Sequence, residues 1–532
     1  MSFDFDVVIV GSGFGGSVTA LRLAERGKRV CVLEQGRRPS SRDLERAGDD
    51  PRALAWAPDL KLTGVLSLDV FRHLAVLRGV GVGGGSLIYA GVLLEPRASF
   101  FRSPAWSHLS ADFATELAPH FASVRRMLGV ADNPYKGLQD EWLARAAARM
   151  GKGDTYGTVP QGIFFGDSER ETPDPFFGGA GPARRGCTQC GRCLSGCAYG
   201  AKNSLDLNYL HLAERHGARI LSERQVTHVE PLPGGGYRVH QRHAWDRSVR
   251  HAPISARQVV LAAGVLGTLE VLFASRDRYR SLPALPPSLG RVVRTNSEAL
   301  VGILARDREQ NLTHGATISS HFYPNEKTHI TQNRLPPSFD LMRFGMGPLV
   351  DGPDARRRAL RVLSGMAGRP VATARTQIVS DWHRRMTMLT VMQDTDTELA
   401  FGYGRTPFRG LRRGLTSQAV RGAQLAYIRE ANEAARAFAE ASGGTPLNSV
   451  LESVGNLSVT AHILGGAVMA PNPEQGVIDR DHQVFGYAGL YVVDGSALPV
   501  NVGVNPSLTI AALAERFAAR FLAREAEAPH AR

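Results

Sequence analysis

The chain has 532 residues, of which 43% are hydrophobic and 21% charged, a composition typical of a soluble globular protein with two or three domains. Its apolar stretches are shorter than the roughly 18 residues that a membrane-spanning helix needs. The net charge is +13, but the arginines are scattered, and the densest runs, 355–361 and 409–414, contain no aromatic residue. This pattern argues against specific nucleic-acid binding and leaves room for peripheral contact with an anionic membrane surface.

The N-terminal sequence, MSFDFDVVIVGSGFGG, runs directly into an apolar segment and a glycine-rich turn. It lacks the basic segment, the apolar run and the small-residue cleavage site of a secretory signal peptide. We therefore expect a cytoplasmic protein, in which closely spaced cysteines stay reduced rather than forming disulfides.

The first forty residues predict a complete strand–helix–strand unit. A short apolar strand over 6–10 ends in the turn GSGFGG, and a helix over 17–27 and a second strand over 29–34 follow. Glycines at this spacing permit the tight bend, the approach of the backbone to a pyrophosphate, and the packing of helix on strand. An acidic residue at the end of the second strand can accept the ribose hydroxyls. We expect a dinucleotide site formed by Gly11, Gly13, Phe14, Gly15, Gly16 and Glu34.

Two further segments fit a bound cofactor. Residues 79–91, GVGVGGGSLIYAG, predict a loop whose backbone N–H groups can converge on an anion. Residues 258–270, QVVLAAGVLGTLE, predict a strand that ends in small residues able to lie against a flat cofactor, and a hairpin with PGGG as its turn precedes it. These segments supply the candidate contacts Gly81, Gly83, Gly84, Gly85, Ser86, Ala263 and Gly264.

The last hundred residues contain the candidate catalytic groups. SVTAHILGGAVMA, residues 458–470, places His462 just before a Gly-Gly pair, and a strand over 489–494 follows. A helix is predicted over 504–523, with Asn505 as its N-cap and Pro506 at its first position. The start of such a helix stabilises negative charge on a group bound next to it. Taken alone, His462 fits a hydrogen-bonded core histidine as well as a catalytic group.

These motifs carry a family resemblance. In chain order, GSGFGG, GVGVGGGSLIYAG, LAAGVLGT and HILGG…GLYVVDGSALP…GVNPSLTIAALAER resemble the glucose–methanol–choline (GMC) oxidoreductases, and the C-terminal block resembles the sterol-oxidase branch. The resemblance implies an α/β fold with a Rossmann-type FAD-binding domain and a substrate domain that has a mixed β-sheet and helices. We expect an FAD-binding domain from 1–97, 203–297 and 453–527, a substrate domain from 98–202 and 298–452, and a frayed tail over 528–532.

The resemblance also implies the site and its chemistry. FAD is expected to bind non-covalently, because the loop over 79–91 offers no histidine or cysteine for attachment. His462 would be the active-site histidine, since a histidine beside an alcohol can take its proton or stabilise the alkoxide. Asn505 would be its polar partner, and Val226 would pack near the adenine. Contacts with the flavin are implied for Asp494, Gly495, Asn505, Pro506 and Ser507.

The expected reaction is FAD-dependent oxidation of a small-molecule alcohol, with hydride transfer from the carbinol carbon to flavin N5. The expected substrate is a bulky apolar secondary alcohol such as a sterol, and the electron acceptor is oxygen or a redox partner. One alternative is a long-chain alcohol or sugar dehydrogenase of the same family. Another is a non-catalytic flavin and iron–sulfur electron carrier.

The segment GCTQCGRCLSGCAYGAK holds Cys187, Cys190, Cys193 and Cys197 with the spacing C-x2-C-x2-C-x3-C. This spacing suits an iron–sulfur cluster, which would pass flavin electrons on singly and favour a dehydrogenase. The run has no second cysteine set and is followed by Ala198 instead of proline. Zinc, and disulfides or free thiols, are the alternatives.

A base in the substrate domain is the last expectation. Sterol oxidases of this fold carry a glutamate shortly after a T-H-I stretch, which moves a proton within the steroid ring after oxidation. Here the sequence is KTHITQNRLPP, with Thr331 at the corresponding place. On a strand, Glu326 would face the opposite side. We expect oxidation without efficient isomerisation of the double bond.

Overall fold

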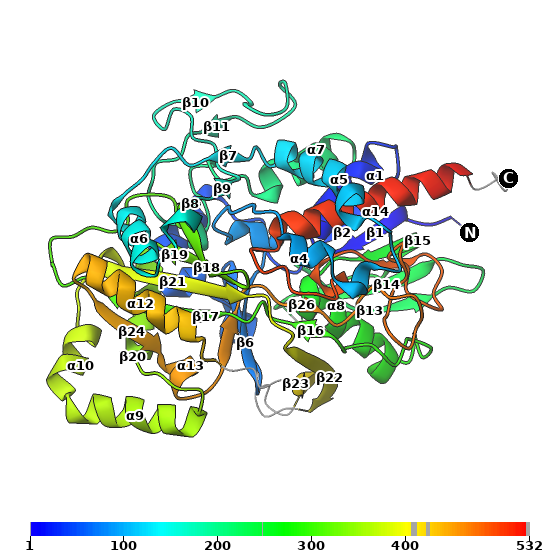
Figure 1. Cartoon of the computed structure of the whole chain (residues 1–532). Coiled ribbons are helices and arrows are strands. Elements are labelled where there is room, and N and C mark those ends of the chain that lie inside the picture. The colour runs from blue at the N-terminus through cyan, green and yellow to red at the C-terminus, as the bar shows by residue number, and fades with distance from the viewer. Residues whose placement is uncertain (1, 247, 406–411, 422–425, 528–532) are drawn as a thin grey trace.

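The computed structural model describes residues 2–246, 248–405, 412–421 and 426–527. Within these residues the chain forms two large β-sheets, and helices cover each of them. The two sheets lie next to one another in Figure 1. Both described termini lie on the side of the first sheet. The expected frayed tail, 528–532, falls outside the described residues, as do residues 409–411 of the basic run at 409–414.

The first sheet has the strand order β12-β2-β1-β15-β14-β13, with β27 also paired to β15. Its central strands are parallel and buried on both faces, which explains the unbroken apolar run at the start of the chain. The predicted hairpin is confirmed, because β13 and β14 are antiparallel and Gly234–Gly236 have positive φ. The strands are β1 (Phe5–Val10), β2 (Val30–Leu33), β12 (Arg219–Leu221), β13 (Arg224–Pro231), β14 (Tyr237–His243), β15 (Ile254–Leu261) and β27 (Leu490–Val492).

Helices complete this Rossmann-type layer. Helix α1 begins at Phe14, within the stretch Gly11–Gly16 and earlier than the predicted start at Ser17, and packs against the C-terminal helix α14, which in turn packs against α5. Helix α14 begins at Ser507, later than predicted, so the expectation that Asn505 is its N-cap is wrong. The helices are α1 (Phe14–Ala24), α5 (Phe113–Met127), α7 (Tyr209–Arg215), α8 (Gly264–Phe273) and α14 (Ser507–Glu527).

The second sheet has the order β20-β24-β17-β21-β19-β18-β8. Helices α6 (Leu138–Arg149) and α12 (Arg429–Ser442) cover one face through a shared apolar core, and the other face is turned toward His462. The α/β class is confirmed, but all pairings between these described strands are antiparallel, where a mixed sheet was expected. The strands are β8 (Gly157–Thr158), β17 (Ala299–Leu304), β18 (Ser320–Asn325), β19 (Thr328–Asn333), β20 (Met346–Pro348), β21 (Met386–Gln393) and β24 (Thr445–Ser449).

Two smaller sheets lie between the large ones and bring His462 to the junction. One has the order β23-β22-β16-β26, and the other has the order β25-β6-β5. His462 follows β25 and precedes β26. The strands are β5 (Leu66–Val70), β6 (Leu74–Gly79), β16 (Val293–Arg294), β22 (Glu398–Arg405), β23 (Arg413–Arg421), β25 (Ser458–Thr460) and β26 (Leu464–Gly465).

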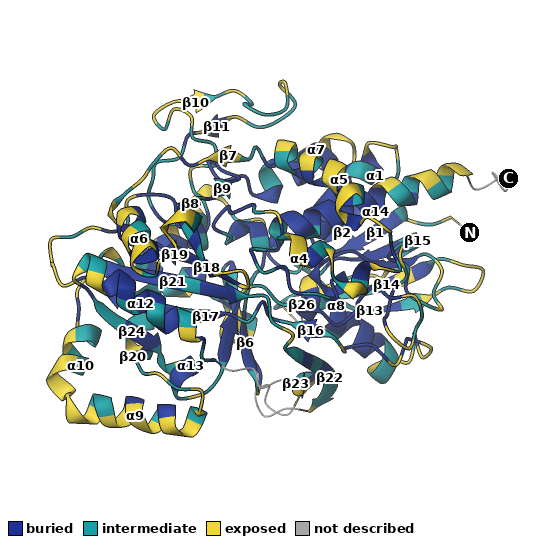
Figure 2. Ribbon diagram, viewed as in Figure 1, coloured by how far each residue is buried: buried dark blue, intermediate teal, exposed yellow. Residues whose placement is uncertain are grey.

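The remaining elements are short or peripheral. Figure 2 shows that both large sheets are mostly buried, whereas α9 and α10 are largely exposed at the edge of the molecule. No described helix is long and apolar enough to span a membrane, and the cytoplasmic location stays a prediction. These elements are α2 (Ser41–Asp49), α3 (Pro51–Leu54), α4 (Ala98–Phe101), α9 (Ala355–Gly368), α10 (Pro370–Gln377), α11 (Trp382–Arg385), α13 (Val450–Ser453), β3 (Trp56–Ala57), β4 (Leu62–Thr63), β7 (Ala131–Asp132), β9 (Pro160–Gln161), β10 (Glu171–Thr172) and β11 (Arg184–Arg185).

Candidate active site

In the N-terminal glycine turn, Gly11–Gly16, a Cβ atom would clash at Gly11, Gly15 and Gly16 but would fit at Gly13. A Cβ atom at Gly15 would lie 1.6 Å from the carbonyl oxygen of Val493, and a Cβ at Gly16 would lie 2.1 Å from that of Gly11. A Cβ at Gly13 would meet nothing within 4 Å. The turn therefore leaves space at Gly13, at the N-terminus of α1, where a phosphate can approach the backbone.

The second glycine loop, Gly81–Ser86, lies directly against this turn. A Cβ at Gly84 would lie 2.7 Å from Cα of Gly13, and the Ser12 hydroxyl accepts a hydrogen bond from the N–H of Gly83 at 3.0 Å. Within the loop, the hydroxyl and the N–H of Ser86 donate to the Gly83 carbonyl at 2.7 and 3.2 Å. The two loops together form one glycine-lined surface.

Glu34 lies at the end of β2, as predicted, but its carboxylate already has protein partners. Its Oε2 accepts from the N–H and the hydroxyl of Ser12 at 3.1 and 2.7 Å, and its Oε1 accepts from the N–H of Gly36 at 2.9 Å. A carboxylate has about four lone-pair positions. One position therefore remains for a ribose hydroxyl. Val226 is buried in β13, and Arg224 in the same strand donates its N–H to the Glu34 carbonyl at 2.8 Å.

The later segments meet the same surface. A Cβ at Gly11 would lie 2.7 Å from Cα of Ala263, at the strand end before Gly264. Asp494 is fully enclosed, accepts from the Thr268 hydroxyl at 2.6 Å and from the N–H of Ser496 at 2.8 Å, and its pKa is raised by burial. A Cβ at Gly495 would lie 3.5 Å from the carbonyl oxygen of Ile463, the residue after His462. The nucleotide surface and the histidine are therefore adjacent.

His462 is oriented by a carboxylate that the sequence did not reveal. Glu298, just before β17, accepts a hydrogen bond from Nδ1 of His462, and its other oxygen accepts from the N–H of Ala461 at 2.9 Å. Glu298 is almost completely buried. A carboxylate at Nδ1 fixes the tautomer with the proton on Nδ1, so that Nε2 keeps its lone pair.

Asn505 contacts the opposite side of the ring. Its Nδ2 lies 3.3 Å from Nε2 of His462, and its Oδ1 is buried without a hydrogen-bond partner among the described residues. The structure thus brings together His462 and Asn505, as predicted. Pro506 and Ser507 follow at the start of α14, where the Pro506 carbonyl accepts from the N–H of Ile510 at 2.9 Å.

Two asparagines hold the segments that carry Glu298 and Asn505. The Asn296 side chain donates to the Val504 carbonyl at 2.9 Å and accepts from the N–H of Gly503 at 2.8 Å. In return, Oδ1 of Asn501 accepts from the N–H of Asn296 at 3.1 Å. This reciprocal pair fixes the distance between the two chain segments, and hence the geometry around His462.

The second sheet turns a polar strip toward His462. On β19, His329 and Thr331 share one face, and the pKa of His329 is held well below its usual value by burial and by the neighbouring His321, Arg97 and His462. Nδ1 of His329 and the hydroxyl of Thr331 are buried without partners among the described residues. Unpaired buried polar atoms cost about 1–3 kcal/mol each, so this strip is suited to a polar ligand group.

Glu326 is not on the strand, so the parity argument made from the sequence is wrong for it. The residue is exposed and lies between β18 and β19, and Arg97 donates to its carbonyl oxygen at 2.6 Å. The side chains that share the face of Thr331 on β18, β19 and β21 include His321, Tyr323, His329, Asn333, Met388, Thr390 and Met392. None of these is a carboxylate.

The cysteine run, residues 187–197, is not arranged as a metal site. Among the described residues, no three His, Cys, Asp or Glu side chains are placed to hold a metal ion, and all five cysteines are free thiols. Burial and the neighbouring cysteines raise the pKa of Cys187 and of Cys190, which disfavours the thiolate that a metal requires. The structure does not support the iron–sulfur expectation, and of the alternatives it shows free thiols.

The run instead connects the second sheet to the glycine loop. The N–H of Cys193 donates to the Thr317 hydroxyl at 3.0 Å. Lys202, fully buried, donates to the carbonyl oxygens of Leu87, Tyr89 and Cys193 at 2.8, 2.9 and 2.7 Å. Burial lowers the pKa of Lys202. The run therefore has a structural place next to the cofactor surface.

A Rossmann-type nucleotide surface beside a histidine with a carboxylate at Nδ1 is the arrangement of a dinucleotide-dependent oxidoreductase. The family comparisons specify it further. A family model described as FAD dependent oxidoreductase matches residues 6–335, and one described as GMC oxidoreductase matches residues 385–514. The chain belongs to the GMC oxidoreductases, which are FAD-dependent enzymes acting on CH–OH donors.

Individual relatives agree with this family. A cholesterol oxidase of Mycobacterium tuberculosis is 42% identical over 97% of this chain and 91% of its own. A cholesterol oxidase of Acinetobacter baumannii is 37% identical over 97% of this chain and 94% of its own. In fold, the crystal structure of pyridoxine 4-oxidase from Mesorbium loti matches with a TM-score of 0.63 at 18% identity, covering 98% of this chain and 99% of that one.

Proposed function

We propose that this enzyme oxidises the secondary hydroxyl of a bulky apolar molecule, a sterol or a sterol-like alcohol, to a ketone. The observation that carries the proposal is the His462 ring, whose Nδ1 is bonded to Glu298 and whose Nε2 faces Asn505. The names of the two cholesterol oxidases, 42% and 37% identical over nearly the full chain, support the substrate class.

In this proposal His462 takes the hydroxyl proton. Nε2 holds the free lone pair and accepts the proton, while the Glu298 carboxylate offsets the positive charge that forms on the ring. Asn505 holds the substrate oxygen through its amide without changing its own charge. When bound, FAD supplies the acceptor for the hydride that leaves the carbinol carbon.

The residues present fit FAD. The open position at Gly13 would receive the pyrophosphate, the free position on Glu34 would receive a ribose hydroxyl, and Val226 would pack near the adenine. We assign the flavin end of FAD to the surface where the glycine loop, the end of β15, the segment after β27 and the start of α14 meet. That surface is formed by Gly81, Gly83, Gly84, Gly85, Ser86, Ala263, Gly264, Asp494, Gly495, Asn505, Pro506 and Ser507.

We also propose that FAD is bound non-covalently and that oxygen reoxidises it. No histidine or cysteine occurs in residues 79–91, and the hydroxyl of Tyr89 donates to the Asn203 carbonyl at 2.8 Å. Both cholesterol oxidases are named as oxidases, and the described cysteines do not form a metal site that could carry electrons away.

The product of a Δ5-3β-hydroxysteroid should keep its double bond in place. On β18, β19 and β21 the face that carries Thr331 has no carboxylate, and the Thr331 hydroxyl has no hydrogen-bond partner among the described residues that could activate it as a base. Glu298, before β17, is bound to His462 and to the N–H of Ala461. We expect the unconjugated ketone as the product. The test monitors the absorbance of a conjugated enone, which should not appear quickly. Fast appearance of the conjugated product, with no isomerase added, would contradict this assignment.

The function is tested by anaerobic reduction of the purified holoenzyme. Sterols, long-chain primary alcohols and sugars are mixed with it separately, and the loss of flavin absorbance is followed. The proposal predicts fast bleaching by sterols and slow or no bleaching by the other two classes. Fast bleaching by long-chain alcohols alone, or by sugars alone, would reject the substrate class.

A further inference from the structure

The outer face of α9 is unusual for a soluble surface. Arg356, Leu360, Leu363 and Ala367 follow the i, i+4, i+7, i+11 spacing of one helical stripe, and all four are exposed. Leu360 is 67% exposed and Leu363 is 51% exposed. The two leucines point outward on one stripe and form an apolar ridge, whose exposure to water is energetically unfavourable.

The ridge continues beyond α9. Val371 in α10 is 64% exposed and Ile378, immediately after α10, is 81% exposed. Leu341 and Phe344, in the 3-10 segment Pro337–Gly345 that packs against α10, are exposed as well. We call α9, α10 and this segment the docking surface.

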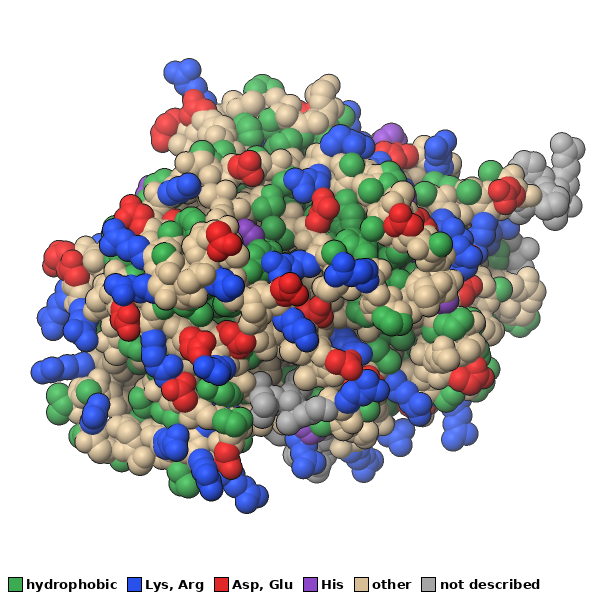
Figure 3. Space-filling model, viewed as in Figure 1, with side chains coloured by type: hydrophobic (Ala, Val, Ile, Leu, Met, Phe, Trp, Pro, Cys, Tyr) green, Lys and Arg blue, Asp and Glu red, His purple; other side chains and the backbone are tan. Residues whose placement is uncertain are grey.

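The segment 355–385, which contains α9 and α10, is strongly basic. Residues 355–385 contain eight arginines and one acidic residue, Asp381. Six of the arginines are exposed, and a carboxylate that acts on two of them is Asp354 at the start of α9, whose pKa is lowered by its backbone bond to Arg357 and by the charges of Arg357 and Arg356. Figure 3 shows arginine or lysine and hydrophobic side chains next to one another along the lower left edge, where Figure 1 places α9 and α10. The exposed arginines are Arg356, Arg357, Arg361, Arg369, Arg375 and Arg384.

The inner side of α9 is firmly held, so the outward leucines do not result from a loosely attached helix. Val362 is fully buried, and the Arg358 guanidinium donates to the carbonyls of Gly352 and Glu452 at 2.8 and 3.3 Å and to the Asn456 side chain at 2.8 Å. An amphipathic helix with arginines beside its apolar stripe is the form that lies in the interface of an anionic bilayer.

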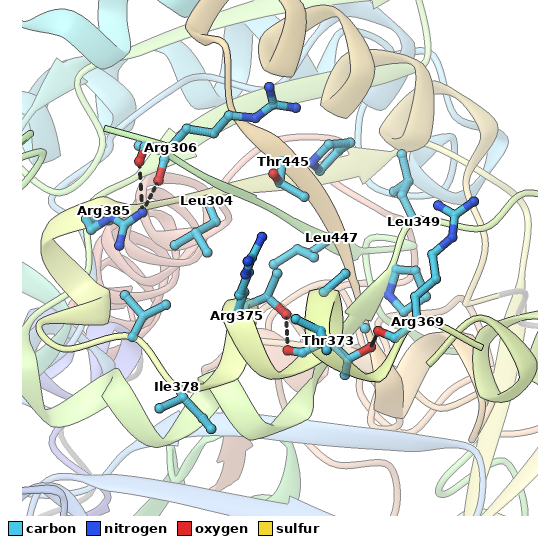
Figure 4. Close-up of a pocket in the computed structure, with 18 of the residues that line it drawn as sticks. Leu304, Arg306, Leu349, Arg369, Thr373, Arg375, Ile378, Arg385, Thr445 and Leu447 are labelled. Carbon is cyan, nitrogen blue, oxygen red and sulfur yellow. Dashed lines mark hydrogen bonds between the residues drawn. The ribbon is translucent and has the colours of Figure 1, made fainter. Parts of the chain in front are cut away.

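A cavity of about 1050 Å³ opens between this surface and the second sheet. Figure 4 shows Leu304 and Leu447 from the sheet facing α10, with Arg306, Arg369 and Arg375 around them. The opening is therefore basic, and its inner wall is apolar.

Strand β17 links this cavity to the histidine. Glu298, Leu300 and Leu304 have the same parity, so they share one face of the strand. The six residue steps from Glu298 to Leu304 span about 20 Å at the rise of a β-strand. The cavity thus lies about one sterol length from the carboxylate that orients His462.

We propose that α9, α10 and Pro337–Gly345 dock this enzyme on an anionic lipid bilayer, with the cavity facing the lipid. The exposed arginines bind the lipid headgroups, and Leu360, Leu363, Val371 and Ile378 enter the acyl boundary. On this face of β17 the side chains of Met346 and Met386 cover Gly302, between Leu300 and Leu304. An apolar alcohol would pass from the bilayer along β17 toward His462 when these two flexible side chains move aside. This last role rests on the proposed function, whereas binding to the bilayer does not.

The test is co-sedimentation of the holoenzyme with vesicles, without any substrate. Vesicles of phosphatidylcholine with phosphatidylglycerol should bind the enzyme, and pure phosphatidylcholine should bind it far less. R356Q/R357Q/R361Q should weaken binding about 100-fold, at roughly 1 kcal/mol for each arginine near the surface. L360S/L363S should weaken it about tenfold. Retained flavin absorbance shows that each variant is folded.

Matched controls separate a specific surface from the overall positive charge. R26Q/R215Q/R219Q removes the same charge from exposed positions around the first sheet, and L138S removes an exposed leucine from α6. Both controls should bind like the wild type. An equal loss of vesicle binding in R356Q/R357Q/R361Q and R26Q/R215Q/R219Q would overturn the proposal. So would a wild-type enzyme that does not bind anionic vesicles, or one that binds neutral vesicles equally well. Since no alcohol is present, these outcomes are independent of the substrate class.

Discussion

The nucleotide surface and the catalytic histidine of this enzyme are built in different ways. The surface begins with a strand, a turn and a helix that are consecutive in the chain, and Gly11, Gly15 and Gly16 each lie too close to other backbone atoms to carry a Cβ. His462, in contrast, meets a glutamate 164 residues earlier and an asparagine 43 residues later. The first site can be tested one glycine at a time, whereas the second depends on the packing of two sheets.

The largest expected effect separates two glycines of one turn. G15A places a Cβ against the backbone of Val493, so α1 cannot pack and the holoenzyme should not form. G13A has room for its Cβ, so the apoprotein should keep the wild-type Tm while its affinity for FAD falls, because the methyl group occupies the phosphate position. Thermal unfolding and FAD titration of both variants check this. Wild-type FAD affinity in G13A would show that the open space does not receive the cofactor.

The next effect concerns the histidine itself. H462A should lower the turnover number by on the order of 10²–10⁴, the usual contribution of a positioned acid–base group. FAD should stay bound, because the nucleotide surface does not depend on the ring. Steady-state kinetics and the flavin spectrum are measured together. Loss of FAD from H462A would assign the residue a structural role.

Glu298 should matter less than the ring that it orients. E298Q keeps the shape but removes the negative charge, so we expect turnover to fall about 10²-fold with little change in KM. E298D should restore part of the rate, because it returns the charge. The pH profile of turnover should differ between E298Q and the wild type. Identical profiles and full activity in E298Q would remove Glu298 from the mechanism.

The smallest expected effect concerns stability at low pH. Burial, with a smaller contribution from Arg97, lowers the pKa of His321 to about 4, and its Nδ1 lies 2.8 Å from Nε2 of His329. The unfolded chain has the ordinary pKa near 6.5, so between pH 6.5 and 4 it binds more protons than the folded one, and stability falls as the pH falls. The loss from His321 amounts to about 3 kcal/mol.

H321Q should therefore flatten the decrease in apparent Tm over this pH window. The control is H216Q, which changes an exposed histidine and should keep the wild-type slope. Parallel curves for H321Q and the wild type would show that His321 is not the group that titrates.

These differences explain which parts could be predicted from the sequence. The strand, turn, helix and acid of the nucleotide surface follow local rules, and the Gly-Gly after His462 made that histidine a candidate. Glu298 could not be predicted, because nothing in RTNSEALVGI marks a partner so distant in the chain. The family resemblance implied Asn505 as the partner of His462. The prediction that Asn505 is the N-cap of the last helix was wrong, because α14 begins at Ser507.

The cysteine run shows the opposite error. Its spacing is local and specific, yet among the described residues the cysteine side chains form no metal site, and Lys202 binds the backbone carbonyl of Cys193. Spacing along a chain does not fix where sulfur atoms point when the segment is anchored by backbone contacts. Anaerobically purified enzyme should therefore contain no acid-labile sulfide, and C190A should keep its flavin and its activity. Iron and sulfide that disappear in C190A would contradict this.

The central claim is that the substrate oxygen meets Nε2 of His462 while Glu298 holds Nδ1. The most direct measurement is a crystal structure of the holoenzyme with a 3-ketosteroid product bound. Our account predicts the ketone oxygen within about 2.6–3.2 Å of both Nε2 of His462 and the Asn505 amide, with the Glu298 bond intact. A ketone oxygen bound elsewhere, with His462 turned away from it, would contradict the account.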